Sequence, residues 1–182
     1  MMITRTVYEN AQKRAANMIK KAGIRILPEE INRIEVVDFG LGNLAKEGVQ
    51  VYTFVNTGRI SAKVLVLFPG QTEPEHWHPP VGNDAGKEET LRVIDGEVYF
   101  YISGDNTFRK GFITGGKENY YTCRHELVMN SGDTITLEPG KKHWFQTKDS
   151  GAVMYSFSTF VCDMLDKFSD PNILREVEII DT

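Results

Sequence analysis

The chain has 182 residues, 25% of them charged and 41% hydrophobic, a composition that suits one globular domain. Its formal charge is −4 and its lysines and arginines form no stripe, which argues against a nucleic-acid partner. No apolar run approaches the ~20 residues that cross a bilayer, and residues 1–14 lack the apolar core of a signal peptide. Cys123 and Cys162 lie far apart, and a domain of this size needs no disulfide. We therefore predict a cytoplasmic protein with reduced thiols and no membrane partner.

The first forty residues have a helical pattern. Between Tyr8 and Ala22, apolar residues recur at three- and four-residue steps, which predicts an amphipathic helix that stops at Gly23. Pro28 then opens a second, shorter helical stretch. We predict a helical extension over residues 1–40, acting as a lid or as a dimer-forming appendage.

The chain becomes rich in short strands after residue 50. Strands are predicted over residues 51–55, 63–68, 91–94, 98–102, 126–129, 134–137, 144–147 and 153–160. Asp95-Gly96 has the composition of a two-residue hairpin turn, and Tyr99 and Tyr101 would then lie on the hairpin surface. Many short strands with regular turn signals favour a sandwich or barrel. We predict one domain, with a β-barrel over residues 48–162 and a tail over residues 163–182.

Three of the four histidines lie beside Pro/Gly turns, at His76, His78 and His143. Residues two apart on an extended strand point to the same face, so His76 and His78 can aim their imidazoles at one point. Neutral imidazole is a good ligand for divalent transition metals, and a carboxylate such as Glu89 biases a site toward harder ions. A His-x-His pair alone is weak evidence, because surface and core histidines show the same spacing.

The spacing around these residues resembles the two motifs of the cupin superfamily. Gly70 is followed by five residues and then His76-Trp77-His78, and Glu89 is followed by six residues and then Gly96. The run from Gly132 through Gly140 to His143 resembles the second motif. The resemblance implies a mainly β fold, the cupin double-stranded β-helix or jelly-roll barrel with N-terminal helices. It also implies one divalent metal held by His76, His78, Glu89 and His143.

Two departures from the superfamily pattern stand out. The gap between His78 and Glu89 is ten residues, longer than usual, so either Glu88 or Glu89 is the ligand; the spacing to Gly96 favours Glu89. Thr147 stands where the second motif has an asparagine.

Four segments narrow the resemblance to the D-lyxose isomerase family of bacteria and archaea. They are Phe68–Thr72, Pro74–Pro80, Lys87–Thr90 and Lys142–Gln146. The family resemblance implies reversible isomerisation of D-lyxose and D-xylulose, often also of D-mannose and D-fructose. It implies Mn²⁺ as the usual metal, with Fe²⁺, Co²⁺, Ni²⁺ and Zn²⁺ as alternatives, a monosaccharide as the partner, and a homodimer.

Such an isomerase must move a proton between C1 and C2 of the sugar while a metal on both oxygens stabilises the enediolate. Lys63 shares a strand face with two leucines and could therefore reach the sugar from the barrel mouth. The alternative interpretation is that Lys63 is a solvated lysine at the end of its strand. Glu75 either carries the proton or orients a ligand histidine. Asp163 and Asp166 follow the last strand and could close over sugar hydroxyls, although loop carboxylates are usually solvated. We predict Lys63, Glu75 and Asp163 as catalytic candidates, and Lys63 and Asp166 as sugar-binding residues.

Several other interpretations stay open at this point. Trp77, Trp144 and Arg92 fall on the face opposite the ligands and are predicted to lie outside the site, and His125 is predicted to be structural. Other cupin functions are a phosphoglucose isomerase, an iron dioxygenase and a non-catalytic sugar-binding protein. A phosphorylated substrate would need a basic cluster, and no such cluster is evident near the predicted barrel mouth.

Overall fold

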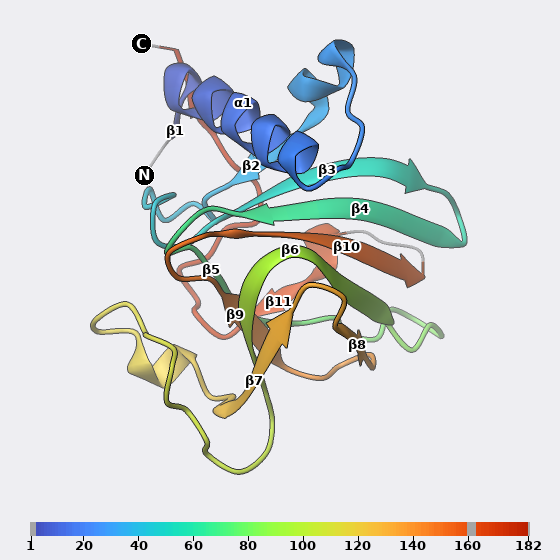
Figure 1. Ribbon diagram of the computed structural model, residues 1–182. Coiled ribbons are helices and arrows are strands. Elements are labelled where there is room, and N and C mark those ends of the chain that lie inside the picture. The colour runs from blue at the N-terminus through green and yellow to red at the C-terminus, as the bar shows by residue number, and fades with distance from the viewer. Residues whose placement is uncertain (1–2, 160–162, 182) are drawn as a thin grey trace.

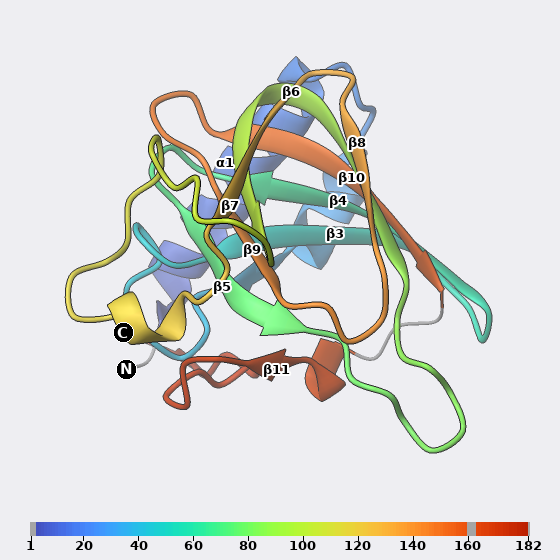
Figure 2. The same ribbon diagram turned by 90° about the horizontal axis from the view of Figure 1, so that it is seen from below.

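Most of the strands form one antiparallel sheet that curls around a core (Figures 1 and 2). The computed structural model describes residues 3–159 and 163–181. The sheet strands within these residues are β2 Glu35–Val37, β3 Val49–Asn56, β4 Ile60–Leu67, β5 Thr72–Trp77, β6 Glu89–Ile102, β7 His125–Asn130, β8 Thr134–Leu137, β9 His143–Gln146, β10 Ala152–Thr159 and β11 Lys167–Phe168. Their spatial order is β11-β5-β9-β6-β10-β4-β3-β2, and β7 and β8 each pair with β6. Phe160, the last residue of the strand predicted over 153–160, and Cys162 lie outside the described residues.

Strand β6 joins the two halves of the barrel. Its first part pairs with β10 and β8, and its second part pairs with β7 and β9. The predicted hairpin turn at Asp95-Gly96 is therefore wrong, because β6 continues through both residues. Gly96 has φ of 91° and lies so close to β10 that a Cβ would sit 2.2 Å from the carbonyl oxygen of Gly151. The turn-like residues mark a bend in one long strand, with a register shift between Val153 and Met154 opposite it.

Helix α1 (Arg5–Lys21) lies across the outer face of β2, β3 and β4, as Figure 1 shows. The Thr4 side chain caps its first turn, and Gly23, with φ of 80°, follows its end as predicted. Its small buried face, centred on Ala15 and Ile19, packs against outward-facing valines of the sheet. The lid alternative is therefore wrong, since the helix covers the outside of the sheet. None of the described helices is long and apolar enough to span a membrane.

Alternation along β3 and β4 separates two apolar layers. Val49, Val51, Leu65 and Leu67 face the barrel interior, and the residues between them face α1. Lys63 has the same parity as the two leucines and is buried with them. The strand-face prediction for Lys63 is thus confirmed, and its ammonium group points into the barrel.

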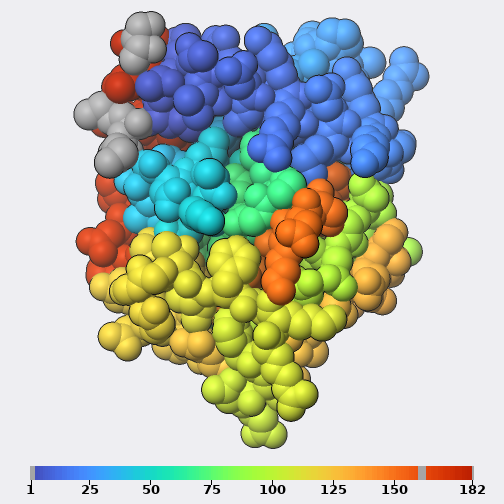
Figure 3. All heavy atoms as spheres, turned by 60° about the vertical axis from the view of Figure 1, so that its left-hand side comes forward, coloured from blue at the N-terminus to red at the C-terminus, as the bar shows by residue number. Residues whose placement is uncertain are grey.

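Two segments outside the sheet complete the barrel. An excursion over residues 103–124, containing the 3₁₀ turn η2 (Glu118–Tyr120), protrudes from the bottom of the molecule (Figure 3). It covers Tyr99 and Tyr101, which are buried against Trp144, so their predicted surface position is wrong. The C-terminal segment, residues 163–181, contains η3 (Asp163–Leu165) and β11, which pairs with β5 along the open end (Figure 2). Its last strand, β12 (Ile179–Ile180), pairs with β1 (Ile3–Thr4) beside α1.

Candidate metal centre and active site

Three histidines meet inside the barrel. His76 on β5 lies opposite His143 on β9, and His78 follows β5 by one residue. One ring nitrogen of each lies within 4.8 Å of the others, and all three residues are buried. The main-chain hydrogen bond from Gly140 to His78, 2.8 Å long, holds the end of the His-x-His segment against the turn before β9. The fold therefore brings His76, His78 and His143 together, as their spacing in the sequence predicted.

Main-chain carbonyls orient two of the imidazoles. Nδ1 of His76 lies 2.8 Å from the carbonyl oxygen of Pro74, and Nδ1 of His143 lies 3.0 Å from that of Lys141. A carbonyl oxygen only accepts, so each Nδ1 carries the hydrogen and each Nε2 keeps a free lone pair. Nε2 of His143 and both ring nitrogens of His78 are buried with no hydrogen-bond partner in the described part of the chain.

The electrostatics keep these imidazoles neutral. Burial lowers the pKa of all three, to about 3 for His78 and to about 4 for His143. Neutral imidazoles with buried, unused lone pairs are the form that binds a divalent transition metal. The donor atoms therefore fit such an ion.

Glu89, the first residue of β6, adds a carboxylate to the cluster. Its Oε2 lies 3.6 Å from Nε2 of His78, and Ser156 donates a hydrogen bond to its other oxygen. Burial opposes its ionisation, but Lys87 and His78 outweigh burial and lower the pKa of Glu89 to about 2. Glu88 is exposed, so of the two glutamates left open by the sequence only Glu89 reaches the histidines.

The C-terminal segment brings charged groups to the same cavity. Asp163 accepts a 2.5 Å hydrogen bond from Nζ of Lys63, and Arg175 lies 3.5 Å from the same oxygen. Asp166 lies 3.9 Å from both His78 and Lys87. The structure therefore places Lys63, Asp163 and Asp166 together beside the histidines, as the sequence analysis expected.

Glu73, rather than the predicted Glu75, faces the cavity. Simple alternation would put Glu73 on the face opposite His76, but the β5–β9 register shifts between these two residues. Glu73 consequently lines the cavity, with Oε1 3.9 Å from Nε2 of His76 and Oε2 buried without a hydrogen-bond partner in the described residues. Burial, and then the charge of Glu89, raise the pKa of Glu73 to about 8.

Glu75 turns away from the cavity. Its carboxylate accepts hydrogen bonds from the main chain and side chain of Thr122, the main chain of Cys123 and the hydroxyl of Ser169. Although it is buried, those hydrogen bonds and Lys142 lower its pKa. The prediction that Glu75 carries the proton finds no support here, because the bulge directs Glu73 inward instead.

Sequence reasoning missed three charged residues of the cavity wall: Glu73, Lys87 and Arg175. Lys87 lies two residues before Glu89, so parity along the chain was a signal that could have found it. Arg175 follows the strands in an irregular segment and carries no local signal. Lys63, Lys87 and Arg175 also form the basic cluster that the sequence analysis did not expect, although each is paired with a carboxylate.

Four residues were predicted to lie outside the site, and none of them lines the cavity: Trp77, Trp144, Arg92 and His125. Trp144 is fully buried among Tyr101, Tyr121 and Phe108, and Arg92 is exposed on β6. His125 contacts the carbonyl oxygen of Asp105 at the start of β7. Thr147, in the place of the motif asparagine, donates a hydrogen bond to the carbonyl oxygen of Phe68.

Two adjoining hollows are available to a ligand. The cavity beside the histidines measures about 30 Å³, room for an ion or a water molecule. A second hollow of about 190 Å³ adjoins it, lined by the 79–86 loop and by Leu165 of η3. Lys87 and Asp166 contribute to both. The fold and this interior define a β-barrel protein with a candidate metal centre at the inner end of a small polar pocket.

Comparison with known proteins identifies the family. The D-lyxose isomerase family model matches residues 20–181. The chain is 47% identical to the D-lyxose ketol-isomerase of Cohnella laeviribosi, covering 93% of this chain and 94% of the relative. It is 46% identical to the D-lyxose/D-mannose isomerase of Thermosediminibacter oceani, covering 99% and 100%. The chain belongs to the D-lyxose isomerase family and is an aldose–ketose isomerase.

Solved structures agree on the fold. The L-ribose isomerase of Acinetobacter sp. DL28 in complex with L-ribose aligns with a TM-score of 0.80, 16% identity and 98% coverage of both chains. The L-ribose isomerase of Cellulomonas parahominis aligns with a TM-score of 0.77, 14% identity, and coverage of 98% and 99%. The predicted cupin barrel is confirmed.

Proposed function

We propose that this isomerase interconverts D-lyxose and D-xylulose, and that it also accepts D-mannose and D-fructose. The activities for which relatives at 46–47% identity are named support the two aldoses. The observation that carries the proposal is the buried histidine cluster with charged groups of both signs beside it. Such a site can bind adjacent sugar oxygens and move a proton between their carbons.

We propose that one divalent ion, Mn²⁺ in the first place, is held by His76, His78, His143 and Glu89. Three neutral imidazoles and one carboxylate can also bind Fe²⁺, Co²⁺, Ni²⁺ or Zn²⁺, but the carboxylate favours the harder ions such as Mn²⁺. When bound, the ion supplies Lewis-acid polarisation of the C1 and C2 oxygens of the sugar.

The proton transfer falls to the carboxylates of the cavity wall. Glu73 has a buried oxygen without a partner among the described residues, and Asp163 and Asp166 approach from the C-terminal segment. One of these carboxylates takes the proton from C2 and returns it to C1, and Lys63 donates a hydrogen bond to a sugar oxygen. For Glu75 we propose the other predicted role, holding β5 and thus His76 in place.

The sugar extends from the small cavity into the hollow beside Leu165. Its reacting end needs the polar groups near the histidines, and its remaining carbons need the larger volume, about 190 Å³. Because residues 163–181 supply part of both walls, we propose that the whole chain acts as a single domain.

Charge pairing favours an unphosphorylated sugar over the phosphoglucose alternative. Lys63 pairs with Asp163, Lys87 lies near Glu89, Asp163 and Asp166, and Arg175 pairs with Glu35. A phosphate would have to break these pairs to gain its own.

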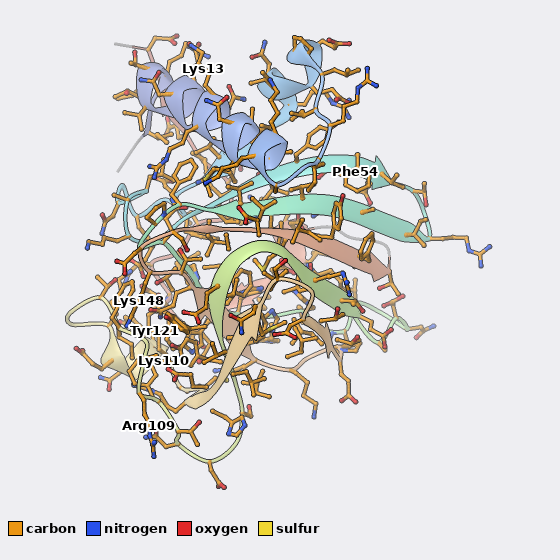
Figure 4. All side chains as sticks on the ribbon, viewed as in Figure 1. Lys13, Phe54, Arg109, Lys110, Tyr121 and Lys148 are labelled. Atoms are coloured by element: carbon orange, nitrogen blue, oxygen red, sulfur yellow. The ribbon has the colours of Figure 1, made fainter. Side chains whose placement is uncertain are left out.

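We also propose a cytoplasmic homodimer. Phe54, Ile60 and Phe157 are exposed on β3, β4 and β10, beyond the area that α1 covers (Figure 4 labels Phe54). Light scattering coupled to size exclusion tests this assembly, and a monomer at micromolar concentration would contradict it.

A substrate panel tests the proposed activity. Protein loaded with Mn²⁺ in oxygen-free buffer is incubated with D-lyxose, D-mannose, L-ribose and glucose 6-phosphate, and ketose formation is measured. The proposal expects the highest turnover with D-lyxose, followed by D-mannose. Activity that requires oxygen would favour the dioxygenase, and sugar binding without turnover would favour the non-catalytic alternative.

A further inference from the structure

A second buried charge cluster lies outside the histidine site. Nζ of Lys117 lies 2.7 Å from Oε2 of Glu47 and 3.0 Å from Oδ2 of Asp170. The hydroxyl of Tyr121 donates a 2.8 Å hydrogen bond to the other oxygen of Glu47. Glu47 and Asp170 are 1% and 4% exposed, although both are acidic. We call these four residues the clasp.

The clasp joins three segments that are distant in sequence. Glu47 precedes β3, Lys117 and Tyr121 belong to the 103–124 excursion, and Asp170 lies in the C-terminal segment. Tyr121 can be followed in Figure 4, where it lies at the root of the excursion beside the barrel wall. The ammonium group of Lys117 is therefore a direct ionic contact between the excursion and the C-terminal segment, beside the carboxylate of Glu75, which accepts hydrogen bonds from Thr122 and Ser169.

The C-terminal segment that Lys117 contacts is also the segment that reaches the active site. Two residues before Asp170, Phe168 pairs with His76, and its ring centroid lies 5.7 Å from that of the imidazole. Further upstream the segment carries Asp163 and Asp166 into the cavity, and downstream it carries Arg175. A shift of the segment at Asp170 would move wall residues on both sides of it.

The energetics make Lys117 the critical member. Buried carboxylates need a partner, and removing one member of a buried ion pair leaves an uncompensated charge. Without Lys117, Glu47 would keep Tyr121 and Asp170 would keep Asn172, but the two acids would face each other across the vacated space. On either side of Asp170 the segment is held by main-chain hydrogen bonds from Ser169 to Glu75 and from Leu174 to Phe39, so the loss of Lys117 acts on the short stretch between them.

We propose that Lys117 is a positioning residue for sugar binding, which holds the C-terminal segment in register so that Asp163, Asp166 and Arg175 wall the pocket. The predicted change in KM rests on the proposed function, whereas the predicted change in hydrogen exchange does not. Lys117 itself contacts neither the cavity nor the histidines. Its effect is on the fraction of molecules whose pocket is assembled before the sugar arrives.

That role predicts a separation of KM from kcat. When only a fraction of molecules is competent, the apparent affinity falls by that fraction, and saturating sugar recovers the assembled state. We expect Lys117→Met to raise KM for D-lyxose about tenfold, with kcat within about twofold of the wild-type value. Lys117→Arg, which keeps the charge, should recover most of the affinity.

Hydrogen exchange gives a readout that is independent of turnover. In Lys117→Met, amides of residues 163–175 should exchange at least about tenfold faster, while those of β4 and β10 keep their protection. The matched control is Lys110→Met, a lysine of the same excursion that is exposed and labelled in Figure 4. Asp170→Asn is the second variant should Lys117→Met fail to fold, because Lys117 then keeps Glu47 as its partner.

The outcomes separate the two proposals. Faster exchange of residues 163–175 together with a raised KM supports the clasp. Wild-type exchange in that segment in a folded Lys117→Met or Asp170→Asn variant overturns it, whether or not a sugar is turned over. An equal effect from Lys110→Met also overturns it. Absence of turnover in the wild-type chain would instead contradict the proposed function and leave the exchange test valid.

Discussion

Glu73 and Glu75 lie two residues apart on β5, yet their carboxylates reach opposite sides of the barrel wall. The register shift between β5 and β9 causes this separation. The first carboxylate has a free buried oxygen within the described structure, whereas the second is saturated with hydrogen bonds. This pair therefore offers a matched test of which glutamate takes part in proton transfer.

We expect Glu73→Gln to lower kcat for D-lyxose by roughly 10²-fold, the usual loss when an acid–base group is removed. Glu75→Gln keeps an oxygen that can accept from Thr122 and Cys123, so kcat should stay within about threefold. Steady-state kinetics at measured metal content compares the two. A larger loss of kcat in Glu75→Gln, at equal metal content, would contradict the assignment.

The histidines and Glu89 could be predicted at the residue scale because their spacing is a property of short segments. Glu73 could not, since a bulge breaks the alternation on which such predictions depend. Arg175 could not either, because it reaches the cavity only through the path of an irregular segment.

At the scale of elements, the bend of β6 at Gly96 is what lets one strand serve both halves of the barrel. We expect Gly96→Ala to lower the free energy of unfolding by at least about 2 kcal/mol more than Gly132→Ala. Both glycines have positive φ, 91° and 97°, but only Gly96 has backbone atoms within 3 Å of the added Cβ. Urea unfolding measures both variants, and equal losses would show that close packing at the bend is unimportant.

The short turn η3 forms one wall of the outer hollow. Leu165 and Met164 are both exposed, but only Leu165 of the two lines this hollow. D-mannose is one carbon longer than D-lyxose, so a larger hollow should favour the hexose. We expect Leu165→Ala to raise the ratio of kcat/KM for D-mannose over D-lyxose roughly threefold to tenfold, with Met164→Ala as the control. An unchanged ratio would place the far end of the sugar elsewhere.

Elements with strong local patterns were predictable, and those defined by distant partners were not. The helix before Gly23 and most strands follow from periodicity. The Asp95-Gly96 hairpin was a wrong prediction because the sequence of a turn and that of a sharp bend are alike. Strand β11 has two residues and exists only because β5 lies beside it.

At the scale of the whole molecule, the active site is assembled from three parts of the fold. The β5–β9 pair supplies the histidines, the start of β6 supplies Glu89, and the C-terminal segment supplies Asp163, Asp166 and Arg175. The excursion packs against the outside of the same barrel wall and holds the C-terminal segment through Lys117. The predicted division into barrel and tail understated this dependence, because ion pairs between distant segments leave no trace in local sequence.

Metal titration tests the central proposal most directly. Chelator-stripped protein receives increasing Mn²⁺ while bound metal and D-lyxose isomerisation are measured together. We expect activity to rise with occupancy and to saturate at one ion per chain, and we expect His143→Ala to lose both binding and activity while His125→Ala keeps both. Full activity in the stripped protein, or in metal-free His143→Ala, would contradict the proposal that the three histidines hold the ion on which isomerisation depends.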